Sequence, residues 1–173
     1  MLRSSSCART RTTSLGAVTG TIRLATAEDA GTIASLIVEA FEEYRAWLVP
    51  PSAALLETAM TIEASLAGSC SAALAYVHEA AAGCVLFEPR GEDLYFGRLA
   101  VLPKYRQTGL ARTLVAFVEE EASRRGCAGV LLSVRVALPA NQQLFARLGY
   151  VEVGRHAHAG YDAPTWIDMR KPV

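Results

Sequence analysis

A short run in the middle of the chain has the residue types of an anion-binding site. An apolar strand turns at Pro103 and becomes a helix at about Gly109. The amino end of a helix carries partial positive charge, so acidic residues normally gather there. This stretch has no acid and three cations, Lys104, Arg106 and Arg112. We interpret it as a site for an anion supplied from outside, most simply a phosphate; the alternative is a plain turn that uses Gly109 for its backbone freedom.

Two common phosphate-binding motifs are missing from this run. It has no Gly-Lys-Ser or Gly-Lys-Thr, which disfavours a nucleotide P-loop. It also lacks Gly-x-Gly-x-x-Gly, which disfavours a dinucleotide fingerprint.

The spacing Arg106-x-x-Gly109-x-Ala111, preceded by Leu99-Ala-Val-Leu-Pro, resembles the coenzyme A pyrophosphate loop of the GNAT superfamily of N-acetyltransferases. In that family, backbone amides at the helix start hold the pyrophosphate. The resemblance implies acetyl-CoA as cosubstrate. It also implies a cofactor-binding set made of Leu99, Ala100, Val101, Arg106, Gln107, Thr108, Gly109, Leu110, Ala111 and Arg112. Within it, the Val101 N–H would support the thioester oxyanion.

A second block, from Asn141 to Tyr150, resembles the family's Asn…Leu-Tyr-x-Lys-Leu-Gly-Phe segment. An ordinary amphipathic helix with a glycine stop is the alternative for this block alone. The resemblance implies that Asn141 binds the pantetheine arm, although it lies closer to the aromatic position than in the common spacing. It places Phe145 beside the thiol.

Phe145 departs from the family pattern, which often has tyrosine there as the general acid for the leaving thiolate. Phenylalanine has no proton to donate. A thiol has a pKa of about 8.5, so its thiolate leaves tolerably near neutral pH. An alkyl amine, with a pKa of about 10.4, must first lose a proton. A general base is therefore of more value here than a general acid.

Four residues are weak candidates for that base: Glu88, Glu92, Asp93 and His158. The alternative for each is a solvated loop charge. Aromatic residues suggest an acceptor site, with the substrate-contacting positions placed in irregular segments at Tyr44 and Tyr161. Trp47 and Tyr95 are further candidates, and core packing is the alternative for all of them.

We expect no metal site. His156 and His158 would share one face of a strand, but no third ligand lies nearby in the sequence. The four cysteines form no Cys-x-x-Cys pair, and we expect reduced, mostly buried thiols. They are Cys7, Cys70, Cys84 and Cys127.

The elements around these motifs follow from apolar periodicity and turn residues. Strands are predicted over residues 21–25, 70–77, 83–87, 93–101, 129–136, 150–154 and 165–169. Turns are predicted at residues 80–82 and 89–91. Helices are predicted from the Thr26 cap to Phe41, from the Ser52 cap to Gly68, over 109–125 and over 139–148. Gly97 inside the long strand suggests a bulge.

This order predicts a single-domain α/β fold: a mixed sheet, antiparallel in its N-terminal half, with a parallel pair around the central helix and helices on both faces. The resemblance covers about residues 21–171, and it gives the domain as residues 21–173. Residues 1–20 are rich in Ser, Thr and Arg, and we expect a disordered extension there. A transit peptide is the alternative for this extension.

The 173 residues are about half apolar and carry zero formal net charge. Bulk charge gives no reason to expect nucleic acid or membrane as a partner, and no apolar run is long enough to span a bilayer. We expect a cytoplasmic N-acetyltransferase that moves the acetyl group to a primary amine of a small molecule or peptide, by direct attack in a ternary complex. A catalytically inactive CoA-binding sensing or interaction module is the alternative. The resemblance is compatible with a homodimer.

Overall fold

The computed structural model describes residues 10–15 and 18–173. Its helices are α1 (Ala30–Phe41), α2 (Ala59–Ala67), α3 (Leu110–Arg125) and α4 (Pro139–Arg147), with 3₁₀ turns η1 (Ala27–Asp29), η2 (Glu42–Tyr44), η3 (Ala53–Leu56) and η4 (Pro103–Tyr105). Its strands are β1 (Thr10–Leu15), β2 (Val18–Leu24), β3 (Ser71–Val77), β4 (Ala80–Arg90), β5 (Asp93–Val101), β6 (Gly129–Arg135), β7 (Val151–His156) and β8 (Trp166–Pro172).

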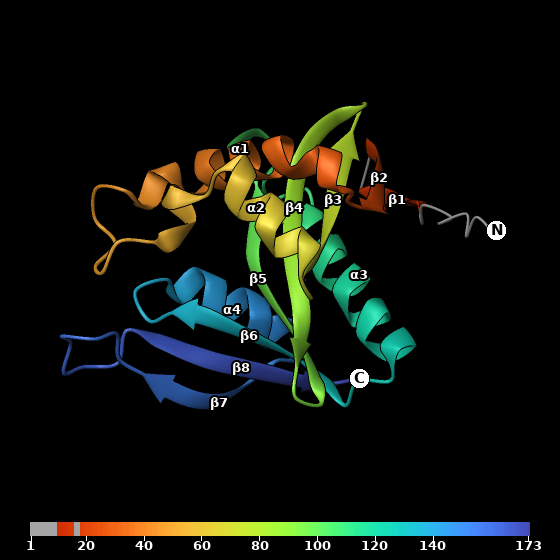
Figure 1. The fold of residues 1–173 in the computed structure, drawn as a ribbon. Coiled ribbons are helices and arrows are strands. Elements are labelled where there is room, and N and C mark those ends of the chain that lie inside the picture. Colours follow the sequence, from red (N-terminus) through yellow and green to blue (C-terminus); the bar gives the residue numbers. More distant parts are fainter. Residues whose placement is uncertain (1–9, 16–17) are drawn as a thin grey trace.

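The strands form one sheet in the order β1-β2-β3-β4-β5-β6-β8-β7 (Figure 1). Neighbours from β1 to β5 are antiparallel, and β5 and β6 are the parallel pair on either side of α3 in the sequence. The sheet confirms the predicted architecture.

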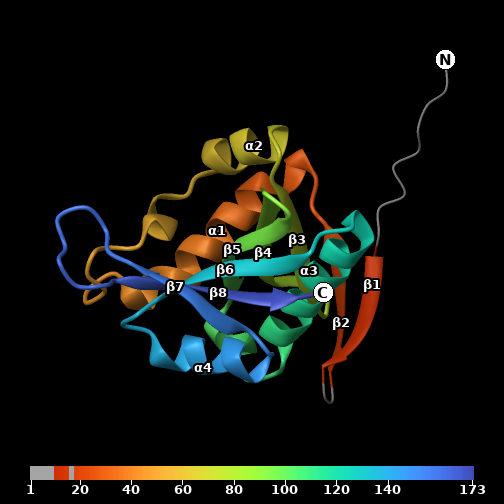
Figure 2. The ribbon, with the colours of Figure 1, turned by 90° about the horizontal axis from the view of Figure 1, so that it is seen from below.

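Two apolar cores lie on opposite faces of the sheet, because the strands carry apolar residues on both sides. One core joins α1 and α2 to the face of Leu74, Cys84 and Ala100. The other joins α3 and α4 to the face of Phe96 and Leu132. The predicted placement of helices on both faces is therefore confirmed (Figure 2).

Two local predictions, one of a helix and one of a turn, are wrong. The expected helix from Ser52 to Gly68 is broken, because the Ser52 side chain caps η3 and Thr58 caps a new helix through reciprocal bonds with Thr61. As a result the Leu56 side chain is 76% exposed. The β3–β4 turn lies at His78 and Glu79, both at positive φ, instead of at residues 80–82.

The expected turn at residues 89–91 lies slightly later, because β4 continues through Pro89 and Arg90. At the amino end, β1 and the first residues of β2 occupy part of the segment expected to be disordered. The expectation for residues 1–9 and 16–17 lies outside the described residues.

Of the described cysteines, Cys84 is buried and Cys70 and Cys127 are half-buried; Cys7 lies outside the described residues. Within the described ranges, no helix has the length and apolarity needed to cross a bilayer.

Candidate active site

The first turn of α3 leaves its backbone N–H groups open. Gly109 is the N-cap residue, with φ of 90°, and it provides no side-chain cap. No acid lies in the first turn. A Cβ added at Gly109 would meet no atom within 4 Å, so the approach to this backbone is unobstructed. The helix start therefore fits an anionic diphosphate, as the sequence suggests.

The loop that leads into α3 is shaped by its own side chains. The Thr108 hydroxyl donates to the Tyr105 carbonyl over 2.7 Å. Gln107 has a φ of 61°, an uncommon conformation for a residue with a side chain. Lys104 and Arg112 are exposed beside the loop, whereas the Leu110 side chain is buried in the core. Leu110 can therefore offer a ligand only its backbone.

The Arg106 side chain does not face this helix start. Its Nη1 pairs with Glu43 over 2.7 Å, its Nη2 donates to the Ala40 carbonyl over 2.9 Å, and its Nε donates to the Val101 carbonyl over 3.2 Å. The expectation that its guanidinium adds positive charge for a phosphate is therefore wrong. Arg106 instead ties the end of α1 to the end of β5.

Next to this loop, β5 and β6 separate. Their parallel register runs from Asp93 opposite Gly129 to Phe96 opposite Leu132, and no later pair follows. On its other side β5 is bulged against β4, because the register shifts between Cys84 and Leu86. Gly97, predicted to mark a bulge, lies opposite Leu86 at this point.

The end of β5 presents backbone groups to the gap left by β6. Leu102 donates its N–H to the Ala82 carbonyl over 3.0 Å. Because successive residues of a strand point their peptide groups to opposite sides, Val101 turns its N–H and C=O away from β4. Leu99 has the same orientation as Val101. An extended ligand arm could therefore pair with β5 in the place that β6 vacates.

On α4, Asn141 lies in the first turn and meets Tyr44 of η2. Burial and the neighbouring Glu43 raise the pKa of the Tyr44 phenol, and a hydrogen bond with the Asn141 side chain opposes that rise. Two residues predicted separately for cofactor and substrate are thus adjacent. Tyr161 is exposed in the β7–β8 loop, and Trp47 packs edge-on against Tyr44 with ring centroids 5.8 Å apart.

Phe145 is 7% exposed and lies in an aromatic cluster with Phe96 and Tyr150. Its ring centroid is 5.9 Å from that of Phe96. The Tyr150 hydroxyl is bonded to Glu119 over 3.1 Å, and burial raises the pKa of this phenol far above its usual range. Tyr150 is therefore not a substitute proton donor for the phenol missing at Phe145.

The four candidate bases lie in different places. Asp93 is held by two hydrogen bonds from Arg170, at 2.7 and 2.8 Å, which lower the pKa of its carboxyl. Glu92 is exposed beside it in the β4–β5 turn, at the opposite end of β5 from the bulge. Burial, followed by the charge of Arg135, lowers the pKa of His158, whose Nδ1 is bonded to the Thr165 hydroxyl.

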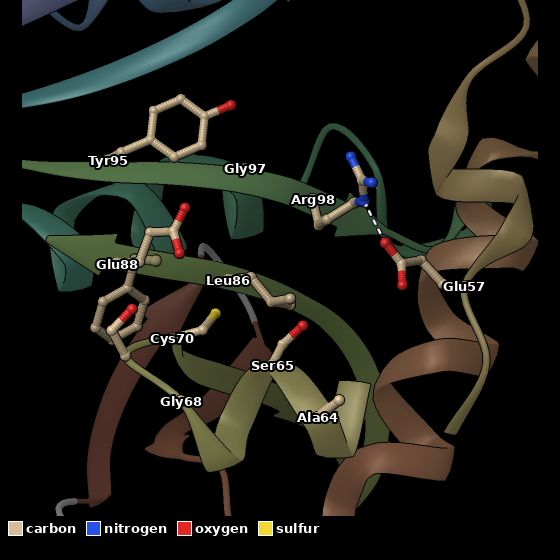
Figure 3. A pocket seen from close by; sticks show the side chains of 12 residues that line it. Glu57, Ala64, Ser65, Gly68, Cys70, Leu86, Glu88, Tyr95, Gly97 and Arg98 are labelled. Carbon is tan, nitrogen blue, oxygen red and sulfur yellow. Dashed lines mark hydrogen bonds and ion pairs between the residues drawn. The ribbon is translucent and has the colours of Figure 1, made fainter. Parts of the chain in front are cut away.

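Glu88 alone among these candidates lines a cavity beside the bulge (Figure 3). The cavity measures about 430 Å³ and lies between α2, β4 and β5. Gly97 and Tyr95 line it on β5, and Glu88 lies opposite Tyr95 in the sheet register. The cavity thus reaches the point at which β5 and β6 begin to separate.

An ion pair bounds the other end of this cavity. Arg98 Nε donates to Glu57 over 2.7 Å, and Glu57 also accepts from the Thr61 hydroxyl over 2.7 Å (Figure 3). The half-buried thiol of Cys70 lies between, with its pKa raised by burial and then by Glu88 and Glu57. Sequence reasoning missed Glu57, Arg98 and Cys70, because α2 and β5 come together only in the folded chain.

Of the two histidines, His156 lies 2.9 Å from Asp168 and stacks on Trp166. His158 also contacts Trp166, edge to face. In the part of the chain that the structure describes, no group of three or more His, Cys, Asp or Glu side chains is placed to hold a metal ion.

Comparisons with known proteins agree with this geometry. Residues 32–150 match the acetyltransferase (GNAT) family. Over 81 residues the chain is 32% identical to a probable N-acetyltransferase 14 of Xenopus tropicalis, covering 46% of this chain and 39% of that protein. The chain therefore spans well under half the length of this curated relative.

Two solved structures share the fold. A PaiA N-acetyltransferase from Thermoplasma acidophilum, in complex with coenzyme A, has a TM-score of 0.70 at 14% identity, covering 88% of this chain and 99% of that one. A ribosomal-protein-alanine N-acetyltransferase from Brucella melitensis has a TM-score of 0.68 at 20% identity, with coverages of 88% and 99%. On the match to residues 32–150, this protein belongs to the GNAT acetyltransferase family.

Proposed function

We propose that the protein transfers the acetyl group of acetyl-CoA to a primary amine of a small molecule or peptide, by direct attack in a ternary complex. The observation that carries this proposal is the open start of α3 next to the gap between β5 and β6. Membership in an acetyltransferase family and a structural neighbour in complex with coenzyme A support it. The cytoplasm, with its acetyl-CoA and reduced thiols, is the location proposed with it.

The residues present fit coenzyme A. The backbone N–H groups from Gln107 to Arg112 would hold the diphosphate, since nothing crowds Gly109. The outward peptide groups of Leu99 would pair with the pantetheine arm, and Asn141 on α4 would also bind it. The Val101 N–H, which points into the gap, would donate to the thioester oxygen as it gains negative charge.

The cavity lined by Glu88 is the proposed acceptor site. An alkylammonium has a pKa of about 10.4, so freeing its lone pair at pH 7 costs roughly 4–5 kcal/mol. Glu88 would attract the ammonium and accept its proton, directly or through water. Positioning and oxyanion support would supply most of the rate, because no covalent enzyme intermediate is needed.

The leaving thiolate needs less help. Phe145 offers no proton, but a thiol of pKa about 8.5 departs as a tolerable anion near neutral pH. Water at the mouth of the gap can protonate it afterwards.

The test is thiol release from acetyl-CoA with a panel of amines, for the unmodified protein and for Glu88→Gln. We expect kcat to fall about 10²-fold in the variant, with the affinity for CoA unchanged. Glu92→Gln removes the same charge at the far end of β5 and serves as the control. Equal rates for Glu88→Gln and Glu92→Gln would remove Glu88 from the mechanism.

The alternative is a CoA-binding module without catalysis, and the observation that favours it is the phenylalanine in the aromatic cluster at position 145. It predicts tight CoA binding without thiol release across a broad amine panel. A domain without a CoA site predicts no binding at all.

A further inference from the structure

Arg135 ends β6 at the mouth of the gap, three residues beyond the last pair with β5. The α1–α2 loop and the β7–β8 loop project from the same end of the molecule, as both ribbon views show (Figures 1 and 2). Arg135 contacts the first of these loops and acts on the second through its charge. Its Nη2 donates to the Pro50 carbonyl over 2.6 Å, and its positive charge, after burial, helps to lower the pKa of His158 in the β7–β8 loop.

The guanidinium of Arg135 is half-buried and incompletely paired. Its Nε is shielded from solvent and has no hydrogen-bond partner. Burial lowers the pKa of Arg135. A partly buried cation of this kind destabilises the folded protein unless a partner is supplied.

Two arginines near the proposed acceptor site are paired with carboxylates. Arg98 pairs with Glu57 and Arg106 pairs with Glu43, each at 2.7 Å. Within the described ranges, no ion pair to a carboxylate is found for Arg135. The difference indicates that its carboxylate comes from a ligand.

The position of Arg135 complements that of Glu88. Glu88 lies opposite Tyr95, which lies opposite Leu131 of β6. Because side chains alternate along a strand, Leu131 and Arg135 share a face. The face therefore has an acid at one end and an unpaired cation about 13 Å along β6 from Leu131.

A bifunctional acceptor fits this arrangement. Its ammonium would lie toward Glu88 and a carboxylate toward Arg135. The spacing corresponds to about four residues of extended peptide, at about 3.3–3.6 Å per residue, or to about three when the last residue has an acidic side chain that extends the reach.

We propose that Arg135 is a specificity-determining residue that binds a carboxylate of the acceptor, so that the preferred acceptors are amines carrying an acidic group a few residues, or an equivalent length, from the amine. This inference rests on the proposed acetyl transfer.

Gln142 fixes the backbone at the end of β6, because its Nε2 donates to the carbonyls of Arg135 and Val136, at 3.0 and 2.9 Å.

The test compares acceptor pairs that differ in one charge: Ala-Ala-Glu-amide with Ala-Ala-Gln-amide, and alanine with alaninamide. For the unmodified protein we expect the peptide acid to have a kcat/KM about tenfold or more above its neutral partner. Arg135→Gln should bring the ratio near one, and Arg135→Lys should keep part of it. Arg155→Gln, which removes an exposed arginine from the edge strand β7, should leave the ratio unchanged.

The ratio of kcat/KM within a pair distinguishes carboxylate recognition from a structural effect of the substitution. Loss of the Pro50 contact would slow the reaction of both members of a pair equally. A preference for alanine over alaninamide, without one between the peptides, would contradict the proposed distance between amine and carboxylate, because the two groups of alanine are too close together to reach Glu88 and Arg135. A ratio near one in both pairs, with acetyl transfer measurable, would overturn the role of Arg135 and leave the proposed function standing.

If none of these acceptors is acetylated, the binding affinities of the two peptides test the proposal instead. Calorimetry in the presence of CoA should then show tighter binding of Ala-Ala-Glu-amide than of Ala-Ala-Gln-amide, with the preference lost in Arg135→Gln. Equal binding would contradict the proposal, whereas absence of CoA binding itself would refute the proposed function.

Discussion

The backbone N–H groups at two helix starts in this protein are treated in opposite ways: one start is capped by side chains, and the other is left open. At η1, the 3₁₀ turn that continues directly into α1, the Asp29 carboxylate accepts from the Thr26 N–H over 2.7 Å and from two nitrogens of Arg23, over 2.8 and 2.7 Å. At α3, the N-cap is a glycine, and no acid or capping side chain is present. The first start is stabilised by the chain itself. The second leaves its N–H groups available, which costs stability that a bound anion can return.

The largest expected effect comes from Gly109→Glu. A side chain and a negative charge would then occupy the place of the diphosphate, so we expect CoA affinity to fall about 100-fold or more. The φ of 90° also strains any non-glycine residue there, by roughly 1–2 kcal/mol. Calorimetric titration with CoA measures the loss.

Gly91→Glu is the matched control for that variant. Gly91 has a φ of 61° in the β4–β5 turn and also has no neighbour within 4 Å of an added Cβ. It shares the backbone strain without touching α3. Equal CoA affinity in the two variants would contradict the assigned place of the diphosphate.

Asp29→Asn should act on the other helix start alone. Losing the charge that Arg23 and Thr26 bind should lower the free energy of unfolding by about 1–2 kcal/mol at pH 7. CoA affinity should not change. Urea denaturation and calorimetry measure the two quantities, with the exposed Asp162→Asn as control. A loss of CoA affinity in Asp29→Asn would show that the two helix starts are not independent.

The Asp29 carboxyl also makes the free energy of unfolding depend on pH. The bond from Arg23 lowers the pKa of Asp29 from 3.8 to about 2. A depressed pKa contributes stability above the ordinary value, and this contribution is lost as the pH falls from about 4 to about 2. The stability gap between the unmodified protein and Asp29→Asn should therefore close over that window in denaturation curves. A gap that persists below pH 2 would mean that packing, not charge, is responsible.

The smallest effect is expected from Arg112→Gln. Arg112 is exposed in the first turn of α3, where water and salt screen its attraction for a phosphate. We expect CoA affinity to fall about two- to threefold at low salt, and the difference to shrink when the salt concentration is raised. A loss as large as that of Gly109→Glu would indicate direct coordination by the side chain.

The two helix starts also illustrate which features of the fold and the site can be predicted from the sequence. The missing acid near Gly109 and the acid at Asp29 are local signals, and both helices form where periodicity places them. The role of Arg106 was mispredicted because its partner Glu43 lies on a distant segment.

The acceptor cavity was beyond sequence reasoning for the same reason. It forms where Glu57, from the turn before α2, meets Arg98 at the β5 bulge. Neither residue stands in a recognisable pattern. Of the candidate bases, sequence could name Glu88 but had no means of ranking it above Asp93, whose partner Arg170 lies near the end of the chain.

The most direct measurement is a calorimetric comparison of coenzyme A with pantetheine, the fragment that lacks the diphosphate and nucleotide, on the unmodified protein and on Gly109→Glu. If the start of α3 is completed by a diphosphate, coenzyme A should bind the unmodified protein about 100-fold or more tightly than pantetheine, and most of that advantage should vanish in Gly109→Glu. Equal affinities for the two compounds in the unmodified protein would contradict the central claim.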